Sequence, residues 1–252
     1  MAEHAKRCAV VTGGGSGIGE GVSRRFARDG HKVAILDIDS DNAERVAAEI
    51  RSAGGVAQAY RADVSMRADM EAAIGAARAA LGPVGILVNN AAIEAFTPFD
   101  EVDDAAWERI MAVNVRGPYL AVQTVLPDMQ EAGWGRIVNI ASLAAQIGAM
   151  NMSAYSTSKG GIVAFTRTLA VELGPKGITV NAIAPSFIDT PMARRAITGD
   201  DFTKQFEAIL AGYPIARMGR PDEIAAACAY FAAEDAGYTT GQLLGVNGGA
   251  AF

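Results

Sequence analysis

Short apolar runs alternate along almost the whole chain with longer segments in which apolar positions recur every three or four residues. Runs of Val, Ile and Leu are typical of buried strands, and the longer period is typical of helices that cover them. The alternation predicts repeated βαβ units around one parallel sheet of about seven strands, with helices on both faces. The expected strands are Cys8–Thr12, Val33–Asp37, Val56–Tyr60, Ile86–Asn89, Arg136–Ala141, Ile178–Ile183 and Leu243–Asn247.

Local signals set the limits of two helices. Asp41 is followed by Glu44 in a capping-box pattern, and that segment closes at Gly54 and Gly55. A second helix is predicted from Tyr155 to Glu172, before Gly174-Pro175. Residues 186–220 interrupt the alternation with two prolines and an isolated helical stretch, which indicates a substrate loop or lid.

Composition is consistent with a single domain that spans residues 1–252. Half of the residues are hydrophobic and 20% are charged, so a large core can form. The net charge of −6 disfavours nucleic acid and anionic membranes as partners. Two cysteines, no leading targeting signal and no apolar stretch of ~20 residues together indicate a cytoplasmic protein. The only histidines, His4 and His31, have no neighbouring ligands, so we expect no metal site.

A glycine-rich turn follows the first expected strand and precedes a helical pattern. Its glycines include Gly13, Gly17 and Gly19, a spacing that differs from the usual dinucleotide-binding fingerprint. Glycines allow the backbone to approach a pyrophosphate closely, and a helix N-terminus offers free N–H groups. Asp37 ends the second strand, where a carboxylate can bond the hydroxyls of an adenosine ribose.

A tyrosine and a lysine share one face of the helix that begins near Tyr155. Lys159 lies four residues further on, and a neighbouring ammonium favours the phenolate form that a tyrosine base needs. Ser142 follows the fifth strand and Asn89-Asn90 ends the fourth, both at the carboxyl edge where parallel sheets bind ligands. Asn114 lies in a helical segment further on.

With these motifs the chain resembles the short-chain dehydrogenase/reductase family over essentially its whole length. The matches occur in the family's order, from the glycine turn through Asn89-Asn90-Ala91 and Asn114 to Ser142 and the Tyr155/Lys159 pair. The resemblance implies a Rossmann-type, doubly wound sheet, and a homotetramer.

The resemblance also implies the role of each site residue. Asn114, Ser142, Tyr155 and Lys159 would form the catalytic tetrad, with Tyr155 as acid/base and Ser142 orienting the carbonyl. Lys159 would bind the nicotinamide ribose, and Asn114 would hold a water molecule. The implied cofactor-binding residues are Gly13, Ser16, Gly17, Ile18, Gly19, Asp37, Asp63, Val64, Asn90, Ala91, Tyr155, Lys159, Pro185, Ile188 and Thr190.

Three positions depart from the family pattern. Ala92 and Ser186 stand where glycine is common, and Asn247 stands where aspartate is frequent. Serine has less backbone freedom than glycine, so Ser186 should stiffen the loop over the nicotinamide.

Three functions remain open at this point. The first is an NAD-dependent enzyme that interconverts a secondary alcohol and a ketone on a free, apolar small molecule. The second is a 3-oxoacyl reductase whose substrate is carried by acyl carrier protein or CoA. The third is a dinucleotide-binding protein without catalysis, which the tyrosine and lysine argue against. NAD is expected over NADP because Asp37 would repel the extra phosphate, and no basic residue lies in the glycine turn or directly after the second strand.

Overall fold

The fold is built on one parallel sheet of seven strands, in the order β3-β2-β1-β4-β5-β6-β7. The computed structural model describes residues 6–196 and 200–251, so His4 and residues 197–199 of the lid lie outside the described part. The order reverses direction between β1 and β4, the kind of position at which doubly wound sheets bind ligands. The strands are β1 Cys8–Thr12, β2 Lys32–Asp37, β3 Val56–Arg61, β4 Val84–Asn89, β5 Gly135–Ile140, β6 Ile178–Pro185 and β7 Leu243–Val246.

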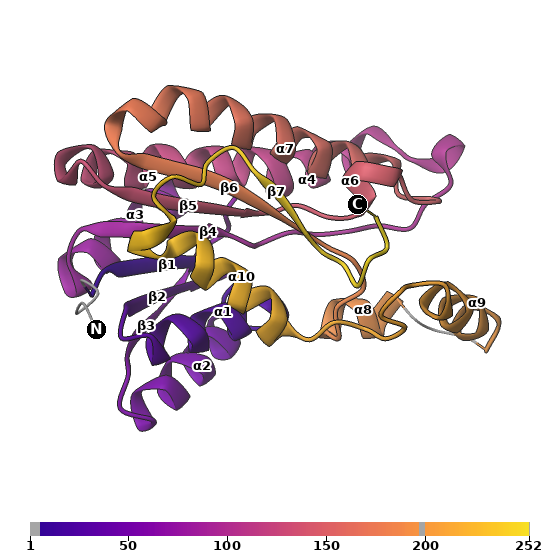
Figure 1. Cartoon of the computed structure of the whole chain (residues 1–252), viewed down its shortest axis with the longest axis horizontal. Coiled ribbons are helices and arrows are strands. Elements are labelled where there is room, and N and C mark those ends of the chain that lie inside the picture. The colour runs from indigo at the N-terminus through magenta and orange to yellow at the C-terminus, as the bar shows by residue number, and fades with distance from the viewer. Residues whose placement is uncertain (1–5, 197–199, 252) are drawn as a thin grey trace.

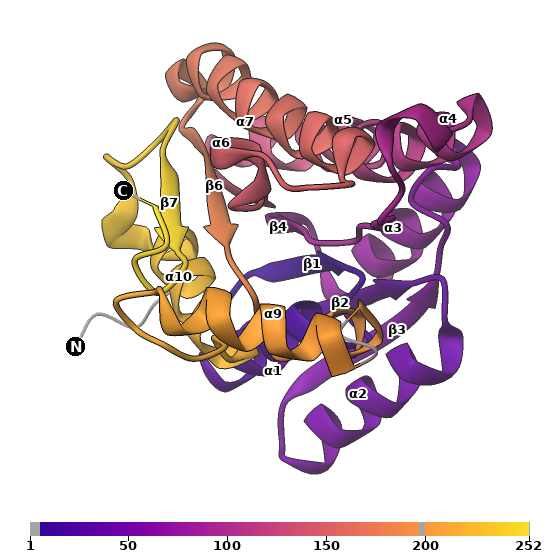
Figure 2. The same ribbon diagram turned by 90° about the vertical axis from the view of Figure 1, so that its right-hand side faces the viewer.

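Helices cover the sheet on both sides, and Figure 1 shows the three layers. One side carries α1 Gly17–Arg28, α2 Ser40–Ser52 and α10 Pro221–Ala232; the other carries α3 Arg67–Leu81, α4 Asp104–Met111, α5 Gly117–Ala132 and α7 Ser153–Leu173. Figure 2 looks onto the carboxyl ends of the strands, where α9 Asp200–Ala211 passes across the view. The short helices α6 Ala144–Ile147 and α8 Pro191–Ala196 follow β5 and β6. The predicted fold class is confirmed.

The two edge strands differ from the prediction that every strand is covered on both faces. Val56 of β3 is 49% exposed, and Leu244 of β7 is also exposed. An edge strand has a neighbour on one side only, so fewer of its side chains are enclosed. The five inner strands are buried almost throughout.

The cap of α2 is displaced by two residues from its predicted position. Asp39, not Asp41, caps α2, because its carboxylate accepts hydrogen bonds from the N–H groups of Asp41 and Asn42 at 3.1 and 3.0 Å. Glu44 instead forms an ion pair with Arg51 on the surface. The capping box predicted at Asp41 and Glu44 is therefore wrong, although the helix itself is present.

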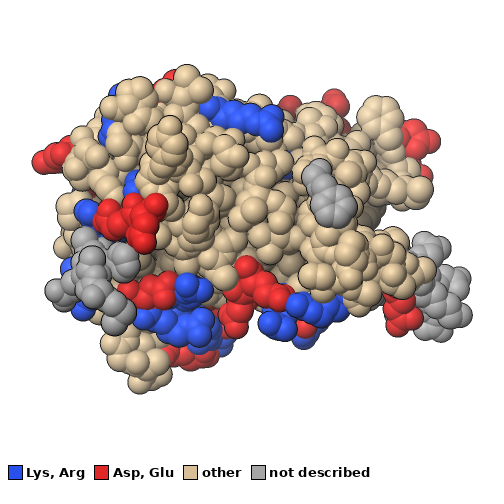
Figure 3. Space-filling model, in the orientation of Figure 1, with Lys and Arg blue, Asp and Glu red and all other residues tan. Residues whose placement is uncertain are grey.

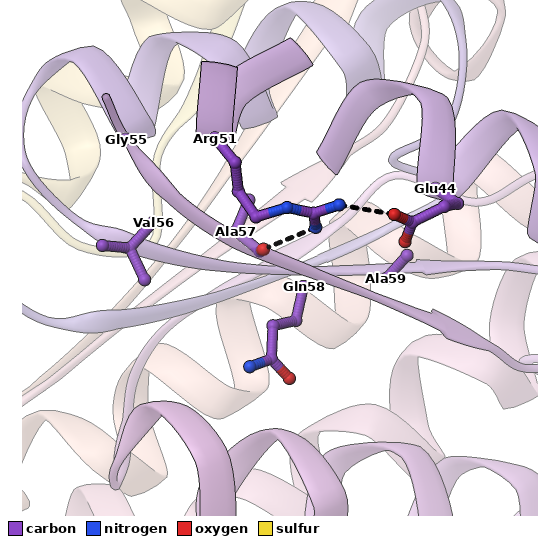
Figure 4. A pocket seen from close by; sticks show the side chains of 7 residues that line it. All are labelled: Glu44, Arg51, Gly55, Val56, Ala57, Gln58 and Ala59. Atoms are coloured by element: carbon purple, nitrogen blue, oxygen red, sulfur yellow. Dashed lines mark hydrogen bonds and ion pairs between the residues drawn. The ribbon is translucent and has the colours of Figure 1, made fainter. Parts of the chain in front are cut away.

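A shallow hollow of about 560 Å³ lies between α2 and the edge strand β3. Figure 4 shows that Arg51 spans it, donating one hydrogen bond to the Ala57 carbonyl and pairing with Glu44. None of its lining residues belongs to the predicted site. No helix in the described part of the chain is long and apolar enough to cross a membrane.

Candidate active site

The hydroxyl of Thr12 joins β1 to the chain that leaves β4. It accepts the N–H groups of Asn90 and Ala91 at 3.0 and 3.1 Å and lies 3.4 Å from the Val88 carbonyl. The Asn90 side chain donates in return to the carbonyls of Thr12 and Gly13, both at 3.0 Å. Asn90 and Ala91 are thus held at the carboxyl edge of the sheet, beside the point where the strand order changes direction.

The glycine turn, residues 13–19, has the conformation that the sequence predicts. Gly13 and Gly17 have positive φ values of 62° and 52°. A Cβ on Gly19 would lie 2.1 Å from the Gly13 carbonyl oxygen, so only glycine fits there. Ser16 begins α1, and its side chain makes no capping bond to the helix. The N–H groups of Gly17 and Ile18, the first two of α1, therefore receive no hydrogen bond acceptor from the Ser16 side chain. Such free N–H groups at a helix N-terminus are suited to bind a pyrophosphate.

Asp37 reaches from the end of β2 to the glycine turn. Its carboxylate accepts the N–H groups of Gly15 and Asp39 at 2.9 and 3.0 Å and is half-buried. A basic residue that the sequence reasoning missed also approaches this turn: Arg45 of α2 donates to the Gly15 carbonyl at 3.1 Å. Arg45 is bound to Glu20 at 2.8 Å, which balances its charge.

The remaining predicted cofactor residues outside α7 come from two other loops, one after β3 and one after β6. Asp63 accepts the hydroxyl and N–H of Ser65 at 2.6 and 2.9 Å, and its pKa is lowered because these bonds outweigh its burial. Val64 is buried where Gly117 passes. In the loop after Pro185, Ile188 is buried. Thr190 lies beside the glycine turn, since a Cβ added to Gly17 would lie 3.1 Å from the Thr190 methyl group.

Ser186 ties this last loop to the C-terminal segment. Its hydroxyl donates to the Asn247 carbonyl at 3.1 Å. The Asn247 side chain in turn donates to the Ala251 carbonyl at 3.1 Å, a bond that an aspartate would be unable to donate. Two departures from the family pattern are therefore in direct contact.

Tyr155 and Lys159 lie on α7 as the four-residue spacing predicts. The Lys159 ammonium is 5.7 Å from the centre of the Tyr155 ring and donates to the Ile140 carbonyl at 2.8 Å. Lys159 is 3% exposed. Ser142 lies two residues beyond β5, where its hydroxyl accepts the Ala144 N–H at 3.1 Å and also hydrogen-bonds to Tyr155.

Asn114 lies in a π-helical turn, Ala112–Arg116, between α4 and α5. The sequence predicts a helical segment there but not this rarer turn, which is frequent at functional sites. The Asn114 amide donates to Ser158 at 3.0 Å, and the Ser158 hydroxyl donates to the Tyr155 carbonyl at 2.7 Å. All four predicted catalytic residues are therefore brought together at the carboxyl edge.

Burial controls the protonation of this site. It raises the pKa of Tyr155 to about 12, with Ser142 lowering it and Glu94 raising it further. Burial lowers the pKa of Lys159 to about 8, against the attraction of Glu94. Within the chain itself, the phenol is thus held protonated. Sequence reasoning missed Glu94; its only signal was an acidic residue among apolar neighbours after Asn90.

The chain is similar to known proteins over nearly its full length. The family described as short chain dehydrogenase matches residues 7–201. A 2-(S)-hydroxypropyl-CoM dehydrogenase of Xanthobacter autotrophicus is 41% identical over 95% of this chain and 94% of its own length. The crystal structure of a levodione reductase superposes with a TM-score of 0.93 at 34% identity, covering 98% of both chains. The crystal structure of a 3-ketoacyl-(acyl-carrier-protein) reductase from Brucella melitensis, complexed with NADH, superposes with a TM-score of 0.90 at 38% identity and covers 100% of both chains.

Proposed function

We propose NAD as the cofactor of this chain. The chain belongs to the short chain dehydrogenase family. It is an oxidoreductase that interconverts alcohols and ketones with a nicotinamide dinucleotide. The preference for NAD rests on Asp37, whose fixed carboxylate faces the glycine turn. Arg45, the nearest basic side chain described there, is already paired with Glu20. A ribose with free hydroxyls suits this carboxylate, and a phosphorylated one is repelled.

The residues present fit a dinucleotide. The uncapped N-terminus of α1 and the three glycines that admit no side chain would hold the pyrophosphate, and Asp37 would hold the adenosine ribose. When bound, the dinucleotide supplies the hydride acceptor and, when oxidised, a positive charge near the tyrosine. Lys159 would bind the second ribose, and Asn90, Ala91 and the loop from Pro185 to Thr190 would enclose the nicotinamide.

The acid/base group in this proposal is Tyr155. Its phenolate accepts the hydroxyl proton of the alcohol, and in reduction the phenol returns a proton to the carbonyl oxygen. Ser142 donates a hydrogen bond to the same substrate oxygen. Because burial raises the pKa of Tyr155 to about 12 with Lys159 already in place, the positive charge of the oxidised cofactor is needed to reach the phenolate. Asn114 fixes the start of α7 through Ser158.

A free substrate is proposed in preference to one carried by a protein. The turn before β5 and the loop before β6, at the amino ends of these strands and away from the catalytic residues, line a hollow of about 620 Å³ in which Lys176 is the single basic residue, so this face offers a carrier protein no cluster of basic groups. An acidic carrier protein is best received by several basic groups. The lid offers the substrate an apolar neighbour, although Phe187 and Phe206 also pack on each other at 4.8 Å between ring centres.

We also propose that the chain forms a homotetramer in the cytoplasm. Figure 3 shows charges of both signs intermixed where α1 and α2 lie, whereas the surface near β7 and α7 is largely uncharged. Val171 of α7 is 78% exposed and Gly160 has open space around it, which suits packing of α7 in a homotetramer. Cys8 and Cys228 are free and buried, as suits a cytoplasmic protein.

A panel of ketones and secondary alcohols, assayed with both dinucleotides, tests the proposal. We expect turnover of free ketones with NADH, and acetoacetyl groups on CoA or acyl carrier protein should be poorer substrates by kcat/KM. A strong preference for the carried substrate would reject the free-substrate proposal. Absence of any Tyr155-dependent turnover would reject catalysis by this tetrad.

A further inference from the structure

The loop after β4 is fastened at both ends beside the catalytic helix. The Asn114 amide bonds both the N–H and the carbonyl of Ile93, each at 2.9 Å. Further along, the Thr97 N–H donates to the Asn151 carbonyl at 2.7 Å, just before α7. Asn151 is the one non-glycine residue with positive φ in the described part of the chain, at 59°. The three residues between these anchors, Glu94 to Phe96, therefore have a fixed position at the carboxyl edge.

Glu94 places a carboxyl group among the catalytic side chains. It is half-buried, and its charge acts on both Tyr155 and Lys159. Burial raises the pKa of the carboxyl, while Arg195 of α8 and Lys159 oppose this shift. Arg195 follows the loop after β6, so the carboxyl lies between the catalytic helix and the start of the lid.

No donor within the described residues is committed to this carboxyl: neither a hydrogen bond nor a close ion pair joins Glu94 to them. The surrounding cations are engaged or exposed. Lys159 donates to the Ile140 carbonyl, and Arg195 is exposed to solvent. A carboxylate that is partly removed from water without a donor costs free energy. A ligand that supplies a donor recovers that cost.

We propose that Glu94 is a specificity residue that accepts a hydrogen bond from the substrate, which is therefore an alcohol or ketone with a second hydroxyl or an ammonium group near the reacting carbon. This inference rests on the proposed function. Substrates with a carboxylate at that place are repelled by Glu94. The apolar lid then contacts the remainder of the molecule, so the substrate combines an apolar body with one polar donor.

A set of matched ring alcohols tests the inference. Oxidation by NAD is followed for cyclohexanol, for the 1,2-, 1,3- and 1,4-cyclohexanediols and for 4-aminocyclohexanol, with the wild type, Glu94→Gln and Glu94→Ala. We expect the wild type to prefer one diol or the amine over cyclohexanol by about tenfold or more in kcat/KM, the worth of one hydrogen bond to a charged group. Glu94→Ala should abolish that preference, mainly through KM.

The second variant separates the two donor classes. Glu94→Gln keeps an acceptor oxygen without charge, so it should retain most of the preference for a diol and lose the preference for the amine. Glu101→Ala, in the exposed turn that follows, is the control and should leave the ratios unchanged. Thermal melting and NADH binding establish that each variant is folded.

The outcomes distinguish the inference from the function on which it rests. If cyclohexanol is oxidised and no diol or amine is preferred, or if Glu94→Ala keeps the preference, the inference fails and the alcohol oxidoreductase remains. If the wild type oxidises none of these compounds, the proposal of a small free alcohol fails, and the role of Glu94 fails with it.

Discussion

Removing the charge at Asp37 should relax the choice between the two dinucleotides. Each carboxylate oxygen accepts one backbone N–H, from Gly15 and from Asp39, at 2.9 and 3.0 Å. Asp37→Asn retains one acceptor oxygen at the same place and removes the negative charge. Asp37→Ser is too short to accept both bonds. The two variants therefore separate electrostatic repulsion from hydrogen bonding.

The expected size follows from the charges and their exposure. Two unit charges ~4 Å apart interact by about 1 kcal/mol in water and about 4 kcal/mol near a protein surface. Asp37 is half-buried, so its repulsion of a 2′-phosphate lies between these limits for each phosphate charge. We expect wild-type kcat/KM to favour NAD about a hundredfold, or about 2.7 kcal/mol. Asp37→Asn should reduce that ratio about tenfold. Asp37→Ser should reduce the ratio and also lower kcat/KM for NAD, because its side chain is too short to hold the ribose.

The assay is an initial-rate series in each dinucleotide at one saturating alcohol concentration. Asp41→Asn is the control, because Asp41 is an exposed carboxylate on the adjoining helix and should leave the ratio unchanged. Equal or better use of NADP by the wild type would refute the reasoning. So would an Asp37→Asn ratio within twofold of the wild type.

Three further changes test other parts of the site. Tyr155→Phe should lower kcat at least tenfold and leave NADH binding, measured by fluorescence, close to wild type; a tenth or more of the activity would rule Tyr155 out as the acid/base. Lys159→Met should be inactive yet more stable at pH 7, by up to about 3 kcal/mol, because burial lowers the pKa of Lys159 from 10.5 to about 8. The wild type regains this stability as pH rises from 8 to 10.5, so an advantage that urea titrations found constant over that range would contradict the burial argument. Gly19→Ala should abolish dinucleotide binding in a calorimetric titration, since its Cβ would meet the Gly13 carbonyl at 2.1 Å, whereas Gly75→Ala in α3, with open space around it, should stabilise α3 by about 0.5 to 1 kcal/mol; comparable binding by both variants would exclude a steric role.

The sequence predicts the sheet, and the positions of Tyr155, Lys159 and Ser142 on it, because these depend on short-range regularities, whereas the role of Asn114 comes from the family resemblance. Apolar runs locate the strands within a few residues, and the spacing of Tyr155 and Lys159 places both on one face of α7. Parallel strands then bring Ser142 and Asn90 to the same edge. These features need no knowledge of which side chains meet.

Features that depend on contacts between distant segments escape the sequence. Asp39 rather than Asp41 caps α2 because the helix begins at Ser40, so the Asp39 carboxylate meets the first free N–H groups. Arg45 reaches the glycine turn only because α2 packs beside it, and the π-helical turn at Asn114 is stabilised through Ile93 and Ser158. The partly buried state of Glu94 likewise follows from the anchored loop, and in the sequence its apolar neighbours are the only sign of it.

The threonine hydroxyl between β1 and β4 also bears on how this chain could acquire new substrates. Its two accepted N–H groups belong to Asn90 and Ala91, so a valine of the same shape would leave both without an acceptor, at about 1 to 3 kcal/mol each. Substitution of Thr12 therefore lowers the stability of the fold whatever it does to substrate choice. The loop carrying Glu94 is instead held at its ends by bonds to the backbone of Ile93 and Thr97, so the Glu94 side chain can change without breaking either anchor. Mutations that change substrate choice can therefore accumulate in that loop. The hydrogen bonds of the Thr12 hydroxyl meanwhile keep the residues that would bind the cofactor in place.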